Sequence, residues 1–179
     1  SASRDGVLRD PTAEALADRL TPRLSMSRST FLRRLARRRI SRFLVAVVSL
    51  RARYYDQRAR EFLADHPDGC IVNLGCGLDT RYWRLSHPTA HVVDLDFPEV
   101  IQLRRLLLDP APRHHLVGTS VLDASWMTQL AQIHPGPYLF FAEGLTIYLE
   151  GKEVRGLVLG LQARFPGSEL VLDASEPAP

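Results

Sequence analysis

The chain of 179 residues is long enough to bury a core, and its length suits one domain. Hydrophobic residues make up 45% of it and charged residues 24%, a composition that excludes an intrinsically disordered protein. The formal net charge of +3 is modest, so the chain as a whole is not strongly basic.

Membrane and metal-binding classes are also disfavoured. The longest apolar run, Phe43 to Leu50, is less than half of the roughly 20 residues needed to span a bilayer. The polar N-terminus lacks the apolar segment of a signal peptide, so we expect a cytoplasmic protein that does not enter a membrane. Cys70 and Cys76 would lie roughly 20 Å apart on an extended chain, too far for a disulfide. No histidine lies near them at ligand spacing, so we expect two packed thiols and no metal.

Residues 12–63 carry the signals of helices, and Pro67 and Gly69 end the last one. Apolar residues recur there at gaps of mostly three or four, as in Val48, Ala52, Tyr55, Ala59, Phe62 and Leu63. Between Arg23 and Arg60 the chain holds twelve arginines and one acid, Asp56. We interpret this segment as helices with a solvated arginine face, because its aromatic residues suit helical packing better than base stacking. A nucleic-acid surface is the alternative.

Beyond Gly69 the pattern changes to strands that alternate with helices. Apolar and β-branched runs predict strands at Cys70–Leu74, Ala90–Asp96, His114–Leu122, Pro137–Glu143 and Ser168–Ser175. Helices are predicted at 97–109, 123–133 and about 150–164. Pro98 opens the first of these helices, and Asp123 is the expected N-cap of the second. One face of the first helix carries Val100, Ile101, Arg104 and Leu107.

Strands that alternate with helices predict a parallel sheet with right-handed crossovers. The continuous apolar runs indicate that helices cover both faces of the sheet. The fold class is therefore a doubly wound α/β core, residues 69–179, preceded by a helical N-terminal segment, residues 1–68. The sequence stops just after the fifth strand, where such sheets often continue. We therefore expect this chain to be a fragment of a longer enzyme from which the C-terminal strands are missing.

Glycines and acids follow the predicted strands at the edge where ligands bind in open parallel sheets. Gly75 and Gly77 follow the first strand, and their missing side chains let a ligand approach the backbone. Asp94 and Asp96 share a face at the end of the second strand. Asp96 follows Gly77 by 19 residues, close to the spacing of an acid that binds ribose hydroxyls. Asp94 either supports Asp96 or pairs with an arginine, and Glu143 directly follows the fourth strand.

The glycine-rich turn does not fit a dinucleotide. Thr80 stands where the third glycine of a G-x-G-x-x-G motif would be, and Asp79 puts a negative charge where a pyrophosphate prefers positive potential. Acids around such a turn favour a cofactor with a cationic centre and a ribose. S-adenosylmethionine has both, and Arg81 or Arg51 would then pair with its carboxylate.

Five motifs resemble, in order and spacing, those of the leucine carboxyl methyltransferase family. That family includes phosphatase-tail carboxyl methyltransferases and bacterial O-methyltransferases of polyketide and other secondary metabolism. The motifs are RARYYD, VNLGCGLDTRYWRL, VDLDFPEV, SVLDASW and AEGLTIYL, and the resemblance covers residues 51–173. It implies a class I, Rossmann-like methyltransferase that uses S-adenosylmethionine and releases S-adenosylhomocysteine.

The resemblance also implies roles for the cofactor-binding residues. Arg51 would hold the methionine carboxylate, and Gly75 and Gly77 would lie beneath the methionine moiety. Asp96 would bind the ribose hydroxyls, and Glu143 would lie beside the amino acid end of the cofactor.

Further residues would complete the cavity. Arg81 and Tyr148 would line it, with Tyr148 on the acceptor side. Many family members carry an aspartate after the third strand, where it contacts the adenine. In this chain Ser120 and Val121 take that place and Asp123 is left to cap the helix, as in the polyketide-type branch.

We therefore predict an S-adenosylmethionine-dependent O-methyltransferase. Its acceptor would be a carboxylate or hydroxyl of a small molecule, such as a polyketide, or a peptide carboxylate. No general base stands out, which suits a carboxylate, whereas a phenol with a pKa of about 10 would benefit from a base. The alternative is a non-catalytic interaction protein on the same fold that uses the arginine-rich segment. The oligomeric state has no signal in the sequence.

Overall fold

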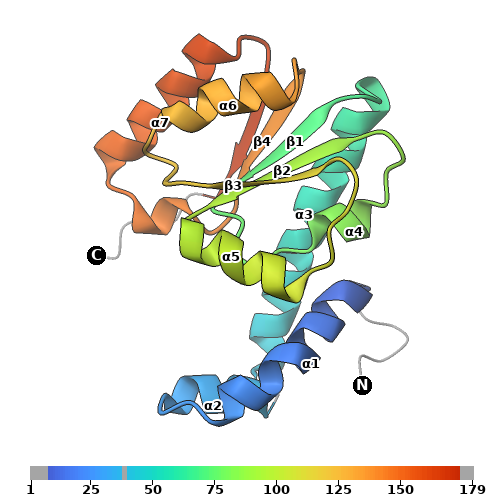
Figure 1. Ribbon diagram of the computed structural model, residues 1–179, viewed down its shortest axis with the longest axis vertical. Helices are drawn as coiled ribbons and strands as arrows, with labels where there is room; N and C mark the ends of the chain where they lie inside the picture. Colours follow the sequence, from blue (N-terminus) through green and yellow to red (C-terminus); the bar gives the residue numbers. More distant parts are fainter. Residues whose placement is uncertain (1–7, 38–39, 174–179) are drawn as a thin grey trace. The chain divides into compact units, whose positions relative to one another are not determined.

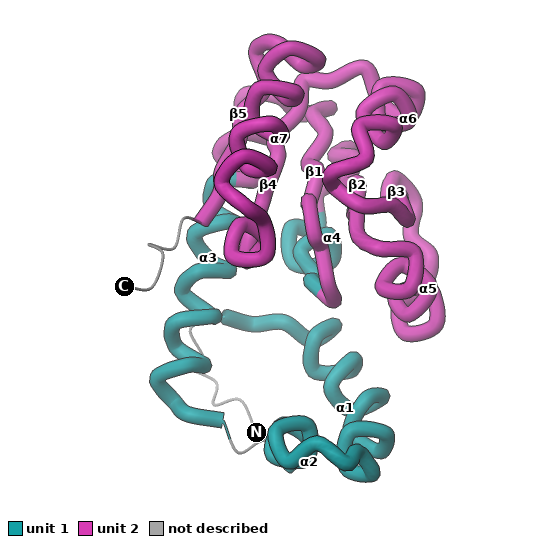
Figure 2. The backbone as a smooth tube through the Cα atoms, turned by 90° about the vertical axis from the view of Figure 1, so that its left-hand side faces the viewer, with its two compact units in different colours: residues 1–58, 79–86 teal, residues 59–78, 87–179 magenta. Residues whose placement is uncertain are grey.

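The computed structural model describes residues 8–37 and 40–173 (Figure 1). The chain divides into two compact units (Figure 2). The helical unit comprises residues 1–58 and 79–86, and the sheet unit comprises residues 59–78 and 87–179.

The helical unit contains α1 (Pro11–Ser25), α2 (Thr30–Ala36), most of α3 (Arg42–Asp65) and α4 (Arg81–Leu85). α1 begins at a proline and is capped by Asp10, whose Oδ1 accepts the amide hydrogen of Ala13 at 2.8 Å. α2 is also capped at its start, where Ser29 Oγ accepts the amide hydrogen of Leu32 at 3.4 Å. The predicted helical character of residues 12–63 is confirmed, with breaks at residues 26–29 and between α2 and α3, where residues 38 and 39 lie outside the described residues.

The sheet unit has, within its described residues, five parallel strands: β1 (Cys70–Leu74), β2 (His91–Asp96), β3 (His114–Gly118), β4 (Tyr138–Ala142) and β5 (Glu169–Leu172). Their order in the sheet is β3-β2-β1-β4-β5. The order reverses between β1 and β4, and a ligand crevice forms at such a reversal. The register places Asn73 beside Asp94 and Asp96 beside Gly118.

Helices cover both faces of this sheet, as the apolar runs predicted (Figure 1). α6 (Ser125–Ile133) and α7 (Gly151–Arg164) pack on one face, where Trp126 and Leu161 join the core residues of the strands, such as Val72 and Val93. α5 (Pro98–Leu107) packs against β2 and β3 on the other face. A short 3₁₀ helix, η1 (Thr146–Tyr148), follows β4. The predicted doubly wound α/β fold is confirmed.

Several predicted boundaries were wrong. β3 ends at Gly118 rather than Leu122, because the chain turns after it and the Asp123 amide donates to the Ser120 carbonyl at 3.0 Å. The N-cap position of α6 is Ala124 rather than Asp123. Asp123 lies one residue before it, and its carboxylate accepts the amide hydrogen of Ser125, the first residue of the helix, at 3.0 Å.

The ends of β4 and β5 also differ from prediction. β4 ends at Ala142, before Glu143, because the chain bends at Gly144, which has a φ of +66°. The predicted fifth strand reached Ser175, but β5 ends at Leu172, and residues 174 and 175 lie outside the described residues.

Cys70 and Cys76 are both buried thiols that form no disulfide within residues 8–37 and 40–173. Across residues 8–37 and 40–173, no helix is both long and apolar enough to cross a membrane.

Candidate functional site

A cavity of about 510 Å³ opens in the sheet unit, where the chain leaves the carboxyl ends of β1 to β4. η1 and the first turn of α7 complete its walls. The residues that line it are Gly75, Gly77, Leu95, Asp96, Phe97, Thr119, Ser120, Val121, Leu122, Gly144, Leu145, Tyr148, Leu149 and Glu153. The cavity therefore brings together six of the residues predicted for the site: Gly75, Gly77, Asp96, Ser120, Val121 and Tyr148.

The turn after β1 has two positions that favour glycine. Gly75 has a φ of +66° and Gly77 a φ of +49°, both in the left-handed region. A Cβ at Gly75 would lie 3.0 Å from Leu145 Cδ1, so a side chain there would also press on the opposite wall. At Gly77 no atom lies within 4 Å of the place where a Cβ would stand. The backbone of Gly77 thus faces open space, as a turn that receives a ligand requires.

Asp96 connects this turn to the end of β2. Its Oδ2 accepts the amide hydrogen of Gly77 at 2.7 Å, and its Oδ1 accepts that of Phe97 at 2.7 Å. An ionised carboxylate has about four acceptor positions, so two remain for a ligand. The two backbone amides fix the orientation of the carboxylate toward the cavity.

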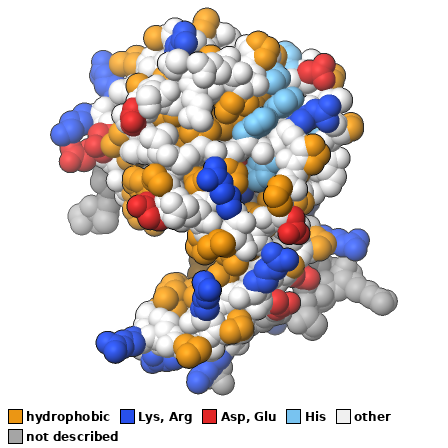
Figure 3. Space-filling model, viewed as in Figure 1, with side chains coloured by type: hydrophobic (Ala, Val, Ile, Leu, Met, Phe, Trp, Pro, Cys, Tyr) orange, Lys and Arg blue, Asp and Glu red, His pale blue; other side chains and the backbone are white. Residues whose placement is uncertain are grey.

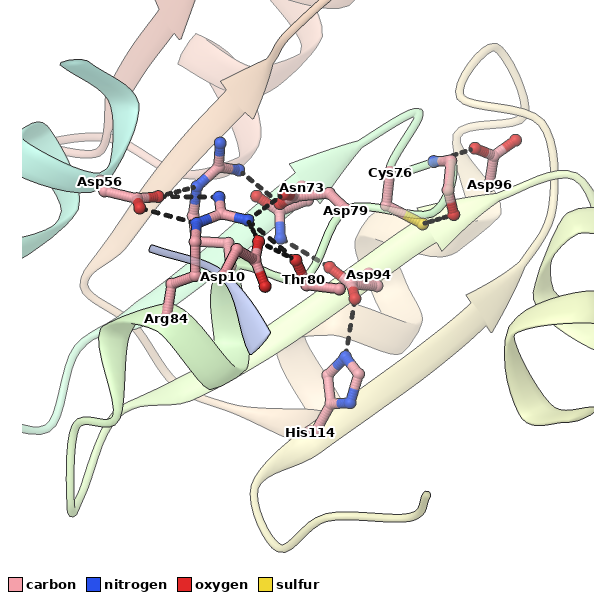
Figure 4. A network of polar contacts seen from close by, with 12 residues as sticks. Asp10, Asp56, Asn73, Cys76, Asp79, Thr80, Arg84, Asp94, Asp96 and His114 are labelled. Atoms are coloured by element: carbon pink, nitrogen blue, oxygen red, sulfur yellow. Dashed lines mark hydrogen bonds and ion pairs between the residues drawn. The ribbon is translucent and has the colours of Figure 1, made fainter. Parts of the chain in front are cut away.

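Asp94 belongs to a separate, buried network. Its side chain is 2% exposed, and it accepts hydrogen bonds from Asn73 Nδ2 at 2.6 Å and from the guanidinium of Arg104. His114 Nε2 lies 2.6 Å from the same carboxylate (Figure 4). Burial alone would raise the pKa of Asp94, but the hydrogen bond from His114, the charge of Arg104 and the bond from Asn73 hold it below its ordinary value. Of the two interpretations left open, pairing with an arginine is confirmed.

The remaining acid, Glu143, lies outside the cavity lining. It is half-buried and directly follows β4, next to Gly144, which does line the cavity. The carboxylate of Asp173 accepts the Gly144 amide at 2.8 Å and fixes the chain at this point. Tyr148 is 79% exposed at the cavity edge.

Arg51 and Arg81 belong to the helical unit. Arg51 is exposed on α3. Arg81 is 2% exposed, pairs with Asp56 at 3.3 Å and Asp79 at 3.2 Å, and lies over the ring of Tyr55 at 5.5 Å. The charge of Asp79 is therefore compensated by an arginine of its own unit, and so it does not require a cationic ligand. The roles predicted for both arginines stay predictions.

The helical unit also holds a buried charge network centred on Arg84, which the sequence analysis did not anticipate. Asp56 on α3 accepts from Arg84 Nε at 2.8 Å and from Arg84 Nη2 at 2.9 Å (Figure 4). Arg84 Nη1 reaches Asp10 at 2.9 Å, Asp79 at 3.0 Å and Thr80 Oγ1 at 3.0 Å. Burial would lower the pKa of Arg84, but these carboxylates raise it, so its charge is permanent. The network joins the N-cap of α1, the middle of α3 and the start of α4.

Other lining residues were also missed. Phe97 and Leu122 flank the predicted residues Asp96 and Val121, and the first stands inside the quoted VDLDFPEV motif. Glu153 lies at the start of α7, where its carboxylate accepts the Glu150 amide at 2.7 Å in a capping box. The E-x-x-E spacing before an apolar helix was the available signal.

Three histidines, His91, His115 and His134, form what we call the histidine cluster, at the amino ends of β2 and β3 and the end of α6. The rings of His91 and His115 stack with centroids 5.4 Å apart, and that of His134 lies 4.8 Å from His91. Histidine side chains gather in a pale blue band on the face shown in Figure 3. Burial lowers the pKa of each member, and so do positive neighbours: Arg113 for His91, and fellow histidines for the other two.

Comparison with known proteins points to a family. Residues 1–161 match the profile described as leucine carboxyl methyltransferase. Over 172 residues the chain is 33% identical to the tetracenomycin polyketide synthesis O-methyltransferase TcmP of Streptomyces glaucescens, covering 96% of this chain and 59% of that protein. Over 135 residues it is 33% identical to the S-adenosyl-L-methionine-dependent methyltransferase dpfgK of Gibberella zeae, covering 72% of this chain and 45% of that protein.

The chain thus spans about half the length of the curated relatives that it matches. Among solved structures, MycE methyltransferase from the mycinamycin biosynthetic pathway, in complex with Mg and SAH, aligns with a TM-score of 0.45 and 18% identity. That alignment covers 73% of this chain and 34% of that one. The family profile extends over most of the sequence and includes all five quoted motifs, so the chain belongs to the leucine carboxyl methyltransferase family.

Proposed function

We propose that this chain is the S-adenosylmethionine-binding part of an O-methyltransferase. The observation that carries the proposal is the cavity at the strand ends, where the open glycine turn and the Asp96 carboxylate meet through a 2.7 Å hydrogen bond. Membership of a methyltransferase family supports the same activity, and so does the O-methyltransferase named among the relatives.

The residues present fit this cofactor. Asp96 retains acceptor positions for a ribose diol, and the turn at Gly75 and Gly77 leaves bare backbone for the methionine moiety. Ser120 and Val121 would face the adenine from the loop after β3. When bound, the cofactor supplies a reactive methyl group on its sulfonium, so the protein has to bind and orient rather than to activate. Holding the acceptor oxygen in line with the methyl group and the sulfur can lower the barrier by about 7–11 kcal/mol in favourable cases.

The charged ends of the cofactor need further partners. We assign Glu143 to the ammonium group, because it follows β4 beside the cavity wall. Arg51, from the helical segment 1–68, is our candidate for the carboxylate, because it opens the RARYYD motif that carries the family resemblance.

The acceptor is proposed to be a small molecule with a carboxylate or hydroxyl, such as a polyketide, methylated in the cytoplasm. TcmP is named for polyketide synthesis, which favours this class over a peptide. Tyr148, exposed at the cavity edge, is our candidate for contact with the acceptor. An acceptor that is itself an ionised carboxylate would need no general base. Among the residues that line the cavity, the acids are Asp96 and Glu153.

Isothermal titration with S-adenosylmethionine and S-adenosylhomocysteine tests this proposal. Asp96→Asn removes the charge and one acceptor from the ribose site, so both ligands should bind about tenfold to a hundredfold more weakly. Glu99→Gln is the matched control, because this exposed acid three positions away is not part of the cavity lining. Its affinity should stay within about twofold of wild type. Absence of binding to the wild-type chain, or equal affinity for Asp96→Asn and wild type, would refute the proposal.

A further inference from the structure

Arg104 is a fully buried arginine that contacts the cofactor turn from outside the cavity. It lies on the sheet-facing side of α5 and is 0% exposed. Its Nη2 donates to Asp94 Oδ2, and its Nη1 donates to the carbonyl oxygen of Gly77 at 2.9 Å. It does not line the cavity itself.

The carboxylate of Asp94 is fixed by its other partners. Asn73 on β1 donates to its Oδ1 at 2.6 Å, and His114 on β3 lies 2.6 Å from its Oδ2. Asp94 is therefore anchored through its two neighbouring strands, and its charge compensates that of the buried guanidinium. The planar fork of Arg104 can then direct its second nitrogen at the Gly77 carbonyl in one geometry.

Gly77 has no side chain that could fix its conformation by packing. No atom lies within 4 Å of the place where its Cβ would stand, and its φ of +49° is one of several that glycine adopts readily. Two strong hydrogen bonds hold the residue, beside a weak one at 3.8 Å from the neighbouring Cys76 thiol to the Gly77 carbonyl oxygen. The carbonyl accepts from Arg104, and the amide donates to Asp96 Oδ2 at 2.7 Å.

We propose that Arg104 is a positioning residue of the cofactor site. By holding the Gly77 carbonyl it aims the Gly77 amide at Asp96, and so sets the orientation of the carboxylate that binds the ribose. Asp94 is the counter-charge that makes a buried arginine possible at this point. The inference rests on the proposed function for its ligand, but the contacts from Asp94 through Arg104 and Gly77 to Asp96 do not depend on that function.

Two variants and one control separate positioning from a general contribution to stability. Arg104→Met alone would leave Asp94 buried without its cation, which destabilises proteins strongly. The double variant Asp94→Asn/Arg104→Met removes both charges and still deprives the Gly77 carbonyl of its guanidinium donor. Arg104→Lys keeps the charge but loses the planar fork, so it should retain part of the wild-type affinity and of the Gly77 protection. Arg105→Met is the control, because Arg105 is exposed and next along the same helix.

Two readouts are needed. The first is hydrogen exchange of the Gly77 amide by NMR without ligand, compared with core amides such as those of Val72 and Leu74. In wild type the Gly77 amide should be protected. In the double variant it should lose protection while the core amides keep theirs, and Arg105→Met should match wild type.

The second readout is the dissociation constant for S-adenosylhomocysteine. It should rise about tenfold in the double variant, the effect of one charge-assisted hydrogen bond, with a smaller rise for Arg104→Lys. A double variant that keeps both Gly77 protection and wild-type affinity would overturn the proposal. So would a Gly77 amide that exchanges freely in wild type, a test that needs no variant. If wild type binds no cofactor but Gly77 protection behaves as stated, the proposed function fails and the positioning contact stands.

Discussion

Asp56→Asn offers a test of the buried charge network in the helical unit. Asp56 is 1% exposed and accepts three hydrogen bonds, from Arg84 at 2.8 and 2.9 Å and from Arg81 at 3.3 Å. The substitution leaves both guanidinium groups buried with less counter-charge. Removing one partner of a buried pair costs about 3–5 kcal/mol. We expect a loss of about 3 kcal/mol, at the lower end of that range, because Asp10 and Asp79 still contact Arg84.

Urea unfolding followed by far-UV circular dichroism measures this loss. With a slope of about 2 kcal/mol per M, the unfolding midpoint should fall by about 1.5 M. Lys152→Met is the matched control, because Lys152 pairs with Glu150 at 2.8 Å while 79% and 69% of the two side chains are exposed. An exposed pair contributes about 0–1 kcal/mol, so the control should barely move. A midpoint for Asp56→Asn that falls no further than that of the control would refute the reasoning.

Three other predictions concern the sheet unit. Gly75→Ala should weaken S-adenosylhomocysteine binding in titration calorimetry, since a Cβ would lie 3.0 Å from Leu145 at a φ of +66°; unchanged affinity would contradict this. The histidine cluster has lowered pKa values when folded, so the unfolded chain binds protons first as pH falls below about 6.5. The thermal midpoint should therefore fall between about pH 7 and pH 5, less so in His115→Asn, and a flat profile would count against the cluster. Burial raises the pKa of the Cys70 thiol to about 12, so a thiol reagent should label Cys70 only after denaturation, as peptide mass spectrometry would show.

Much of the candidate cofactor site was predictable because its signals are local. Glycines that follow a short apolar strand, and an acid at the end of the next strand, mark the carboxyl edge of a parallel sheet wherever they occur. Gly75, Gly77 and Asp96 were found in this way, and all three line one cavity. Pro67 and Gly69 also located the C-terminal end of the long helix α3, because they act on the backbone at their own positions.

The partners of the buried charges were not predictable in the same way. Arg104 stood on an apolar helix face in the sequence, but its contact with Gly77 crosses 27 positions and depends on how α5 packs against the sheet. Asp56 stood alone among arginines, yet the arginines that it binds, Arg81 and Arg84, come 25 and 28 positions later rather than from its own segment.

The amino-acid sequence by itself therefore determined the order of the helices and strands, the parallel sheet and the residues at its carboxyl edge. These follow from hydrophobic period, backbone preference and the rule that parallel strands end at one edge. Tertiary structure alone decided which carboxylate neutralises which arginine. It also decided that Asp94 pairs with the buried Arg104 while Asp96 bonds the Gly77 amide and lines the cavity. Ion pairs inside a protein depend on distances of a few ångströms between segments remote in sequence, and no local pattern encodes those distances.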